Sequence, residues 1–243
     1  MTILQDLIAS LPEEAAVRSV MVGPYWTVVC SRHCGMSATL TSDHSRRGAL
    51  VRDLERLQQK SARELAEWAL STNLLEASIG VAAINSMLHV DESLAVEINA
   101  SEVLASHGWG KNVALVGRFH FIPQLRAAAR RLWVIEQQPL EDEYPAESAV
   151  DFLPRADLVA ITGCTLVNHT LDELLALCNP IATVIVLGPS TPFSPILFRS
   201  GVNIISGTYV IDESSVLRTA GQATSLRQVE GVKRLTLVGE KKL

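Results

Sequence analysis

Residues 158–170 read LVAITGCTLVNHT, and this stretch carries the pattern that decides the fold class. Leu158–Thr162 is a short apolar run with the length of a buried strand. Glycine, amide and hydroxyl residues follow it, and Thr170 with Glu173 has the spacing of a helix-capping pair. A strand that passes through a polar turn into a helix is the unit from which parallel α/β sheets are built.

The same unit recurs on both sides of this stretch. Short helical segments separate most of the predicted strands, which lie at 112–116, 132–136, 158–162, 182–187, 202–205 and 234–238. The clearest helices are predicted at 123–130, near 147–153, and from Asp212 onward, and a capped helix is predicted from Asn99. Strands that alternate with helices need crossover connections, so residues 99–243 are expected to form a Rossmann-like, mainly parallel α/β domain.

Residues 1–98 follow a different pattern. A short helix is predicted at 3–10, and glycine-broken strands follow at 17–22, 26–31 and 36–40. The polar residues 41–60 are expected to be a loop or a frayed helix. Further helices are predicted from the capping pair Ser61 and Glu64 to about Leu70, and then over the alanine-rich segment 74–88. This order favours a small α+β domain in which an antiparallel meander precedes helices.

The composition excludes several classes of partner. The formal net charge of −5 argues against nucleic acid as the main partner. No apolar run approaches the roughly 18 residues of a membrane helix, and the N-terminus lacks the features of a secretory signal. The four cysteines show no C-x-x-C pair, so we expect neither a disulfide framework nor a zinc ribbon. A cytoplasmic protein is therefore expected.

Ligands of an open parallel sheet bind beyond the carboxyl ends of its strands, so the loops that follow the strands are the first candidates for a binding site. The loop that begins at Gly117 has one glycine where the dinucleotide fingerprint has three. Glu136 ends the next strand, and its spacing from Gly117 along the sequence is close to that of the acidic residue that binds a ribose in such folds. A solvent-facing glutamate explains this residue equally well. The loops 162–170 and 188–195 are rich in hydroxyl groups and suit a polar ligand. Ordinary capping and a tight turn are the alternatives.

Three possible metal ligands fall on loops at this same edge. His120, Cys164 and His169 offer imidazole and thiolate, which suit zinc, copper, nickel or iron, provided that the loops converge. The neighbouring residues Cys30 and Cys34, with His33 between them, are expected instead to be two buried thiols beside a surface imidazole.

Four runs of sequence carry a family resemblance, at 78–86, 113–119, 161–174 and 188–192. In that order they resemble the putative heavy-metal chelation family. The resemblance implies an enolase N-terminal-like domain at 1–98, a Rossmann-like domain at 99–243, and a site in the cleft between them. It implies that the ligand-binding residues are Asn85, Ser86, Gly117, Phe119, Glu136, Thr162, Gly163, Thr165, Asn168, Gly188, Ser190 and Thr191. The chain departs from the family pattern at His120 and His169, which either adds metal ligands or only changes the shape of the loops.

Two functional classes follow from these residues. The first is a protein that binds a metal or a metal-chelating small molecule in the interdomain cleft. The alternative is a small-molecule enzyme that uses S-adenosylmethionine or a nicotinamide dinucleotide (NAD), with Glu136 on the ribose. A scaffold without a ligand is a third option. A homodimer is expected, because two-fold dimers are the commonest oligomers and segment 74–88 could be buried against a partner chain.

Overall fold

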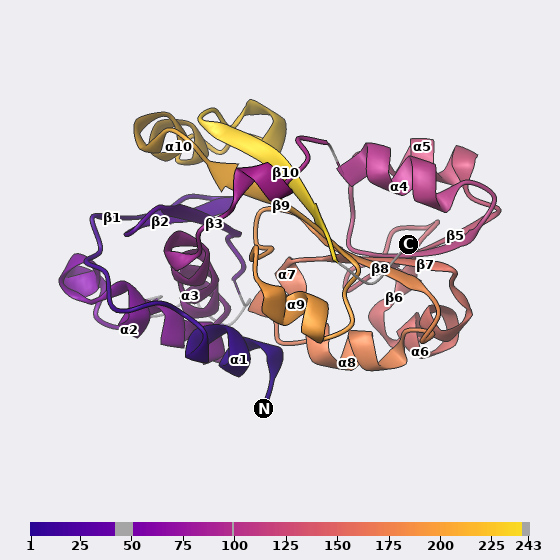
Figure 1. Cartoon of the computed structure of the whole chain (residues 1–243), viewed down its shortest axis with the longest axis horizontal. Helices are drawn as coiled ribbons and strands as arrows, with labels where there is room; N and C mark the ends of the chain where they lie inside the picture. The colour runs from indigo at the N-terminus through magenta and orange to yellow at the C-terminus, as the bar shows by residue number, and fades with distance from the viewer. Residues whose placement is uncertain (42–50, 99, 240–243) are drawn as a thin grey trace.

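The computed structural model describes residues 1–41, 51–98 and 100–239 of the chain. These residues form a mixed α/β protein with a three-stranded antiparallel sheet and a seven-stranded, mostly parallel sheet. Figure 1 shows the small sheet and its helices on one side of the molecule and the large sheet on the other. Residues 42–50 of the predicted loop or frayed helix at 41–60, and the capping position Asn99, lie outside the described residues.

The first hundred residues form the α+β arrangement predicted for them. Helix α1 (Ile3–Ala9) precedes the sheet, whose strands are β1 (Ser19–Val22), β2 (Trp26–Cys30) and β3 (Cys34–Ala38). A 3-10 helix, η1 (Leu54–Gln59), leads to α2 (Ala62–Glu67), η2 (Trp68–Leu70) and α3 (Leu74–Met87). The predicted capping box is confirmed, since the Ser61 side chain accepts from the backbone amide of Glu64 while the Glu64 carboxylate accepts from that of Ser61.

Helix α3 is buried within its own chain. Twelve of its fourteen residues are buried, so the helix has no polar face turned to solvent. It packs against β2, β3 and α2 at positions where the backbones nearly touch. A Cβ on Gly35 would lie 2.2 Å from the carbonyl oxygen of Ala82, and one on Gly80 would lie 1.9 Å from the amide nitrogen of Ala69. The chain itself covers the alanine-rich segment, which therefore needs no partner to bury it.

The large sheet has the strand order β10-β9-β8-β7-β4-β5-β6. When the six strands β4 to β9 are numbered 1 to 6 in chain order, their order in the sheet is 3-2-1-4-5-6, that of a doubly wound fold. The switch point lies between β4 and β7. The strands are β4 (Asn112–Val116), β5 (Arg131–Glu136), β6 (Tyr144–Pro145), β7 (Leu158–Thr162), β8 (Thr183–Leu187), β9 (Ile204–Val210) and β10 (Val232–Val238). All neighbours are parallel except β10, which runs antiparallel to β9. The mainly parallel sheet is thus confirmed, while the two-residue strand β6 has no signal in the sequence.

Helices cover both faces of this sheet (Figure 1). Alternate residues of β4 enter different cores, because successive side chains of a strand point to opposite faces. Val113 and Leu115 pack with α4 (Ala100–Gly108) and α5 (Ile122–Ala128), whereas Ala114 belongs to the cluster on the other face. That other face is covered by α6 (Ala149–Phe152), α7 (Cys164–Val167), α8 (Leu171–Leu177) and α9 (Pro195–Arg199). Short 3-10 helices connect several elements, namely η3 (Glu92–Leu94), η4 (Ala146–Ser148), η5 (Leu153–Arg155) and η6 (Leu226–Gln228).

The two halves of the chain share hydrophobic clusters. Helix α10 (Glu213–Ala220) packs against β2, and the cluster around Val216 includes Val28 and Met36 of the small sheet. The Trp26 indole also donates to the carbonyl oxygen of Thr224 at 2.9 Å. The halves are therefore packed together, and the division at residues 98 and 99 stays a prediction.

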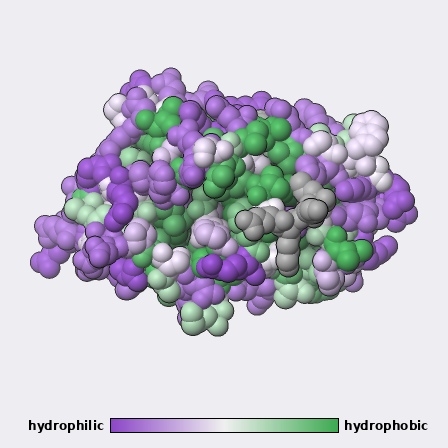
Figure 2. Space-filling view, in the orientation of Figure 1, coloured by the Kyte–Doolittle hydropathy of each residue, from purple (hydrophilic) through white to green (hydrophobic). Residues whose placement is uncertain are grey.

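The surface carries few features that bear on partners. Among the described residues, none of the helices combines the length and the hydrophobicity needed to cross a membrane. Figure 2 shows apolar side chains gathered near the middle of one face, over β10 and residues 92–98, where Leu94, Val96 and Val238 are exposed. The homodimer stays a prediction.

Two sequence-based expectations are wrong. Cys30 and Cys34 form a disulfide rather than two free thiols, because they are directly opposite each other at the end of the β2–β3 hairpin. The expectation of a cytoplasmic protein therefore loses the support that it drew from unpaired cysteines and stays a prediction. Thr170 does not cap α8 with its side chain, since its hydroxyl donates to the Asn168 amide oxygen at 2.8 Å instead.

Candidate functional site

The loop after β8 lies between the two halves of the chain. Ser190 and Thr191 are each only 1% exposed, although the sequence places them on a polar loop. The Oγ of Ser190 accepts a hydrogen bond from the backbone amide of Ala38 at 2.9 Å and lies 3.2 Å from the Oγ of Ser37. The loop is therefore tied to β3 of the small sheet, and Ser190 is held by a structural contact.

The end of α3 approaches the same loop. The side-chain amide of Asn85 donates to the carbonyl oxygens of Met36, at 2.8 Å, and Pro189, at 3.4 Å. Among the described residues, two buried polar atoms here have no hydrogen-bond partner, Oδ1 of Asn85 and Oγ1 of Thr191. Unpartnered buried polar atoms are rare and suit a bound polar group. Ser86 differs, because its hydroxyl donates to the Ala83 carbonyl at 2.7 Å.

The loop after β7 uses most of its polar groups locally. The Thr162 side chain accepts from the Cys164 amide, and the Thr165 hydroxyl donates to the Thr162 carbonyl at 2.7 Å. Gly163 is packed so tightly that an added Cβ would lie 2.5 Å from Oγ1 of Thr191. Neither α7 nor α8 has a side-chain cap, and the Thr170 hydroxyl donates to the Asn168 amide oxygen, so the capping interpretation of this loop is not confirmed.

Glu136 and the loop after β4 form a separate group. Gly117 has a φ of 107°, and an added Cβ would lie 2.9 Å from the Thr162 side chain, so the turn admits only glycine. Arg118 pairs with Glu143, with 2.9 Å between Nε and Oε1, and this hydrogen bond lowers the pKa of Glu143 to about 2. The Glu136 carboxylate accepts from the Gln137 amide at 3.1 Å.

The three predicted metal ligands are not brought together. His169 has a φ of 64°, and its Nε2 lies 2.7 Å from the carbonyl oxygen of Ala69 in the first half of the chain. Burial raises the pKa of the Cys164 thiol, so the free thiol is protonated at neutral pH. In the part of the chain that the structure describes, Cys30, Cys34 and Glu213 are the group of three potential ligands whose atoms lie within 4.8 Å of one another. The ligand atoms of His120, Cys164 and His169 do not form such a group among the described residues, so a metal site there stays a prediction without geometric support.

His120 instead lines a cavity of about 340 Å³ at the carboxyl end of β8 and beside the middle of β9. The wall contains aromatic, small and hydroxyl residues together with two arginines, and the described lining has no acidic residue. It consists of Ala100, Phe119, His120, Phe121, Leu187, Gly188, Ser206, Gly207, Thr208, Ser225, Leu226, Arg227 and Arg234. Three of the predicted site residues, Phe119, His120 and Gly188, thus meet here.

The cavity is electropositive. Burial lowers the pKa of His120, and the positive charges of Arg227 and Arg234 lower it further. Neither arginine has a carboxylate within 4.0 Å among the described residues, whereas Arg118 and Arg218 do. Arginine carries five donors in a planar fork that matches carboxylate or phosphate. The cavity therefore offers two unused forks to an anionic ligand.

The two arginines have no distinctive signal in the sequence. Arg227 follows a polar turn, and Arg234 sits in the last strand, opposite Thr208 of β9. Only the antiparallel pairing of β10 with β9 brings this strand to the cavity. An isolated arginine in an edge strand is usually a solvated surface residue, so pattern alone gives no reason to select it.

The fold and the site define a class of two-part α/β proteins in which a small antiparallel sheet covers one end of a doubly wound sheet. Two family models, both described as putative heavy-metal chelation, match the chain at residues 4–88 and 99–238. The chain belongs to this putative heavy-metal chelation family.

Three similar proteins come from bacteria and archaea, and their names state no activity. The crystal structure of a protein with unknown function from Desulfitobacterium hafniense superposes with a TM-score of 0.84 at 26% identity, over 98% of both chains. One from Pyrococcus horikoshii gives 0.82 at 20% identity over 98% of both chains, which bears on the fold alone. An uncharacterized protein of Methanocaldococcus jannaschii is 28% identical over 182 residues, 72% of this chain and 70% of that protein.

Proposed function

We propose that the protein binds an anionic, metal-chelating small molecule in the cavity beside Arg227 and Arg234. The observation that carries this proposal is the pair of arginines that line a concave site without carboxylate partners among the described residues. Small-molecule sites are typically concave and largely apolar, with a few convergent polar groups. This cavity has those properties.

The chemistry of chelators fits the charge of the cavity. Molecules that bind metals through oxygen carry several carboxylates or comparable anionic groups, because hard cations prefer such ligands. An arginine can bind one carboxylate with two parallel hydrogen bonds. We therefore assign the carboxylates of the ligand to Arg227 and Arg234, and the metal stays with the chelator. The family description, chelation of heavy metals, supports this class of ligand.

The remaining wall would orient the ligand. The rings of Phe119 and Phe121 are stacked, with centroids 5.0 Å apart, and His120 packs edge-on against Phe121. These rings give the ligand an apolar surface. His120, with its lowered pKa, is neutral at neutral pH and offers one donor and one acceptor. Gly188, which has a φ of 107° and an open Cβ position, leaves room at the carboxyl end of β8.

Thermal denaturation with a panel of probes tests the proposal. A ligand that binds only the folded state raises the melting temperature in proportion to its occupancy. Citrate and nitrilotriacetate, each alone and as a zinc complex, are the anionic probes, and glycerol is the neutral one. We expect a shift with at least one anionic probe and none with glycerol.

Matched variants make the assay specific. The double variant Arg227→Ala/Arg234→Ala removes two charges from the cavity, and Arg131→Ala/Arg199→Ala removes two exposed charges elsewhere. The first should abolish the shift and the second should retain it. Equal shifts in both variants would place binding outside this cavity.

No observation favours the alternative, an enzyme that uses S-adenosylmethionine or a dinucleotide. The Thr162 side chain lies against the turn after β4, 2.9 Å from where a Cβ on Gly117 would be, and Glu136, the expected ribose ligand, is not part of the cavity wall. A bare metal at His120, Cys164 and His169 has no geometric support either.

A further inference from the structure

The β2–β3 hairpin ends in a pair of facing cysteines. Cys30 and Cys34 are the last residue pair of the ladder, and residues 31–33 form the turn between them. Directly opposite residues of an antiparallel pair project from the same face of the sheet. The two Cα atoms are therefore only 4.0 Å apart, and the sulfurs form a disulfide.

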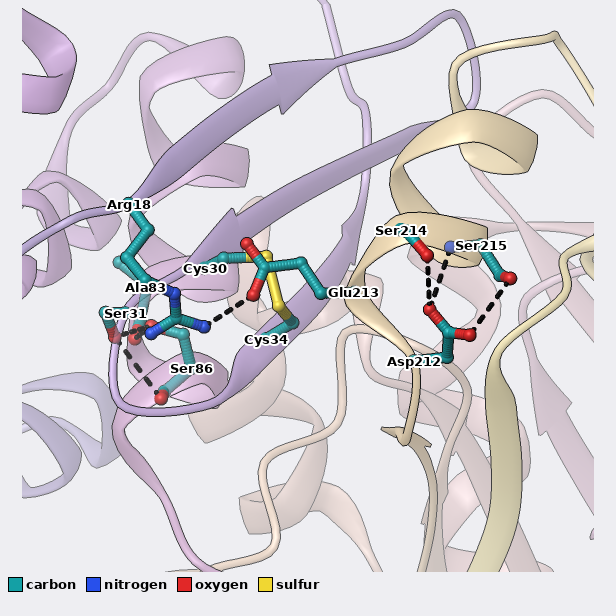
Figure 3. Close-up of a disulfide and its surroundings, with 10 residues drawn as sticks. All are labelled: Arg18, Cys30, Ser31, Cys34, Ala83, Ser86, Asp212, Glu213, Ser214 and Ser215. Atoms are coloured by element: carbon teal, nitrogen blue, oxygen red, sulfur yellow. Dashed lines mark hydrogen bonds and ion pairs between the residues drawn. A yellow bond between two sulfur atoms is a disulfide. The ribbon is translucent and has the colours of Figure 1, made fainter.

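A carboxylate from the other half of the chain faces these sulfurs. Glu213 is the first residue of α10, and one of its carboxylate oxygens lies within 4.8 Å of both sulfur atoms. Figure 3 shows Glu213 reaching toward the disulfide from α10, with the Arg18 guanidinium on its other side. The Arg18 side chain donates to Oε2 of Glu213 at 2.7 Å, and its backbone amide donates to the Cys30 carbonyl at 2.7 Å. Arg18 thus fixes the carboxylate beside the cysteines.

Reduction would turn this group into a ligand set. Two thiolates and a carboxylate are ligands that zinc accepts, and thiolates select soft cations. Two sulfurs on one tetrahedral ion, at about 2.3 Å each, lie roughly 3.8 Å apart. Side-chain rotation at Cys30 and Cys34 can reach that separation, because the backbone already holds the pair on one face.

We propose that Cys30, Cys34 and Glu213 form a binding site for a thiophilic divalent cation when the disulfide is reduced. A dithiol reductant supplies two electrons and two protons, which cleave the sulfur–sulfur bond to two thiols while the dithiol becomes a disulfide. The cation then binds the two thiolates and releases their two protons. Glu213 supplies the third ligand atom, and its other oxygen keeps the hydrogen bond from Arg18. The Arg18 charge offsets the negative charge that remains on the complex.

The site is reachable and separate from the cavity. Cys30 is fully buried, but Cys34 is 8% exposed and the Glu213 side chain is 37% exposed, so solvent reaches the group at Cys34 and Glu213. None of its three residues lines the cavity at Arg227 and Arg234. The two proposals therefore stand or fail independently. The oxidised form blocks the cation, because the sulfurs are bonded to each other.

Cadmium titration of the full chain is the test. The protein is reduced with dithiothreitol, freed of the reductant without oxygen, and titrated with Cd²⁺, whose thiolate complexes absorb in the ultraviolet. We expect this band to saturate at one equivalent per chain for reduced protein and to be absent for oxidised protein. Bound Cd²⁺ should also protect Cys30 and Cys34, but not Cys178, from alkylation measured by peptide mass spectrometry.

Variants assign the ligands. Cys34→Ser should lose the band, and Glu213→Gln should weaken binding at least about tenfold, since even an outer partner of a metal ligand contributes that much. Cys178→Ser and Glu230→Gln are controls that should bind like the wild type. The proposal is overturned if reduced wild-type protein gives neither band nor protection, or if Glu213→Gln binds as tightly as Glu230→Gln. The disulfide would then serve only to fix the hairpin.

Discussion

The backbone amide of Ala38 donates a hydrogen bond of 2.9 Å to the Oγ of Ser190, across 152 positions of sequence. This contact joins the end of β3 to the loop that follows β8. It lies where the two halves of the chain meet, and Ser190 is buried there. The hydroxyl of Ser190 is therefore one of the contacts that hold the small sheet over the carboxyl edge of the large one.

Ser190→Ala should destabilise the protein by about 1–3 kcal/mol, because the half-buried Ala38 amide would lose its hydrogen-bond partner. The free energy of unfolding in urea measures the effect. Ser214→Ala, at an exposed position on α10, is the control and should change stability by less than about 0.5 kcal/mol. Equal values for the two variants would show that the junction does not depend on this hydrogen bond.

Gly80→Ala should be at least as damaging. The added methyl group would meet the backbone of Ala69 at 1.9 Å, and neither helix can move without disturbing a buried core. Overpacking of this kind costs about 1–3 kcal/mol. The comparison is with Gly221→Ala, at an exposed site with a φ of −71°, by thermal or urea unfolding. A Gly80→Ala protein as stable as the wild type would mean that α3 and η2 are not in close backbone contact.

Stability should fall as the pH drops from about 7.5 to about 5.5. Burial lowers the pKa of His33 and of His120 in the folded protein, and nearby cations add to the effect. Below the unfolded value of about 6.5, the unfolded chain therefore binds protons more readily than the folded one, and unfolding becomes easier. The loss should continue until the pH passes below the folded pKa values.

Urea unfolding at the two pH values measures this loss. The double variant His33→Gln/His120→Gln should show a smaller drop than the wild type. The carboxylate of Glu143 acts in a lower window, since its pKa of about 2 makes its contribution disappear only as the pH falls below about 4.5. Constant or increased wild-type stability at about pH 5.5 would contradict the assignment of lowered histidine pKa values.

The alternation of strands and helices could be predicted from the sequence because its signals are local. Leu158–Thr162 and Asn112–Val116 are strands at the predicted residues, and Asp212 caps α10 as expected. The capping box at Ser61 is confirmed for the same reason. These features depend on neighbours within a few residues.

Features that depend on long-range pairing could not be predicted in this way. Cys30 and Cys34 look unpaired in a linear pattern, and only the register of the hairpin sets them opposite each other. Arg234 reaches the cavity because β10 pairs with β9, and no local signal encodes that pairing. The sequence placed His120, Cys164 and His169 at the same edge of the sheet, but their ligand atoms do not form a group within 4.8 Å in the described structure, because loop geometry is not encoded in strand position.

Isothermal titration of citrate into the wild-type protein and into Arg227→Ala/Arg234→Ala tests the central claim most directly. The proposal predicts saturable binding to the wild type that weakens at least about tenfold, or about 1.4 kcal/mol, in the double variant, because charge-assisted hydrogen bonds are lost. The Arg131→Ala/Arg199→Ala protein should bind like the wild type. Binding of equal strength to all three proteins, or to none of them, would contradict the assignment of this cavity to an anionic chelator.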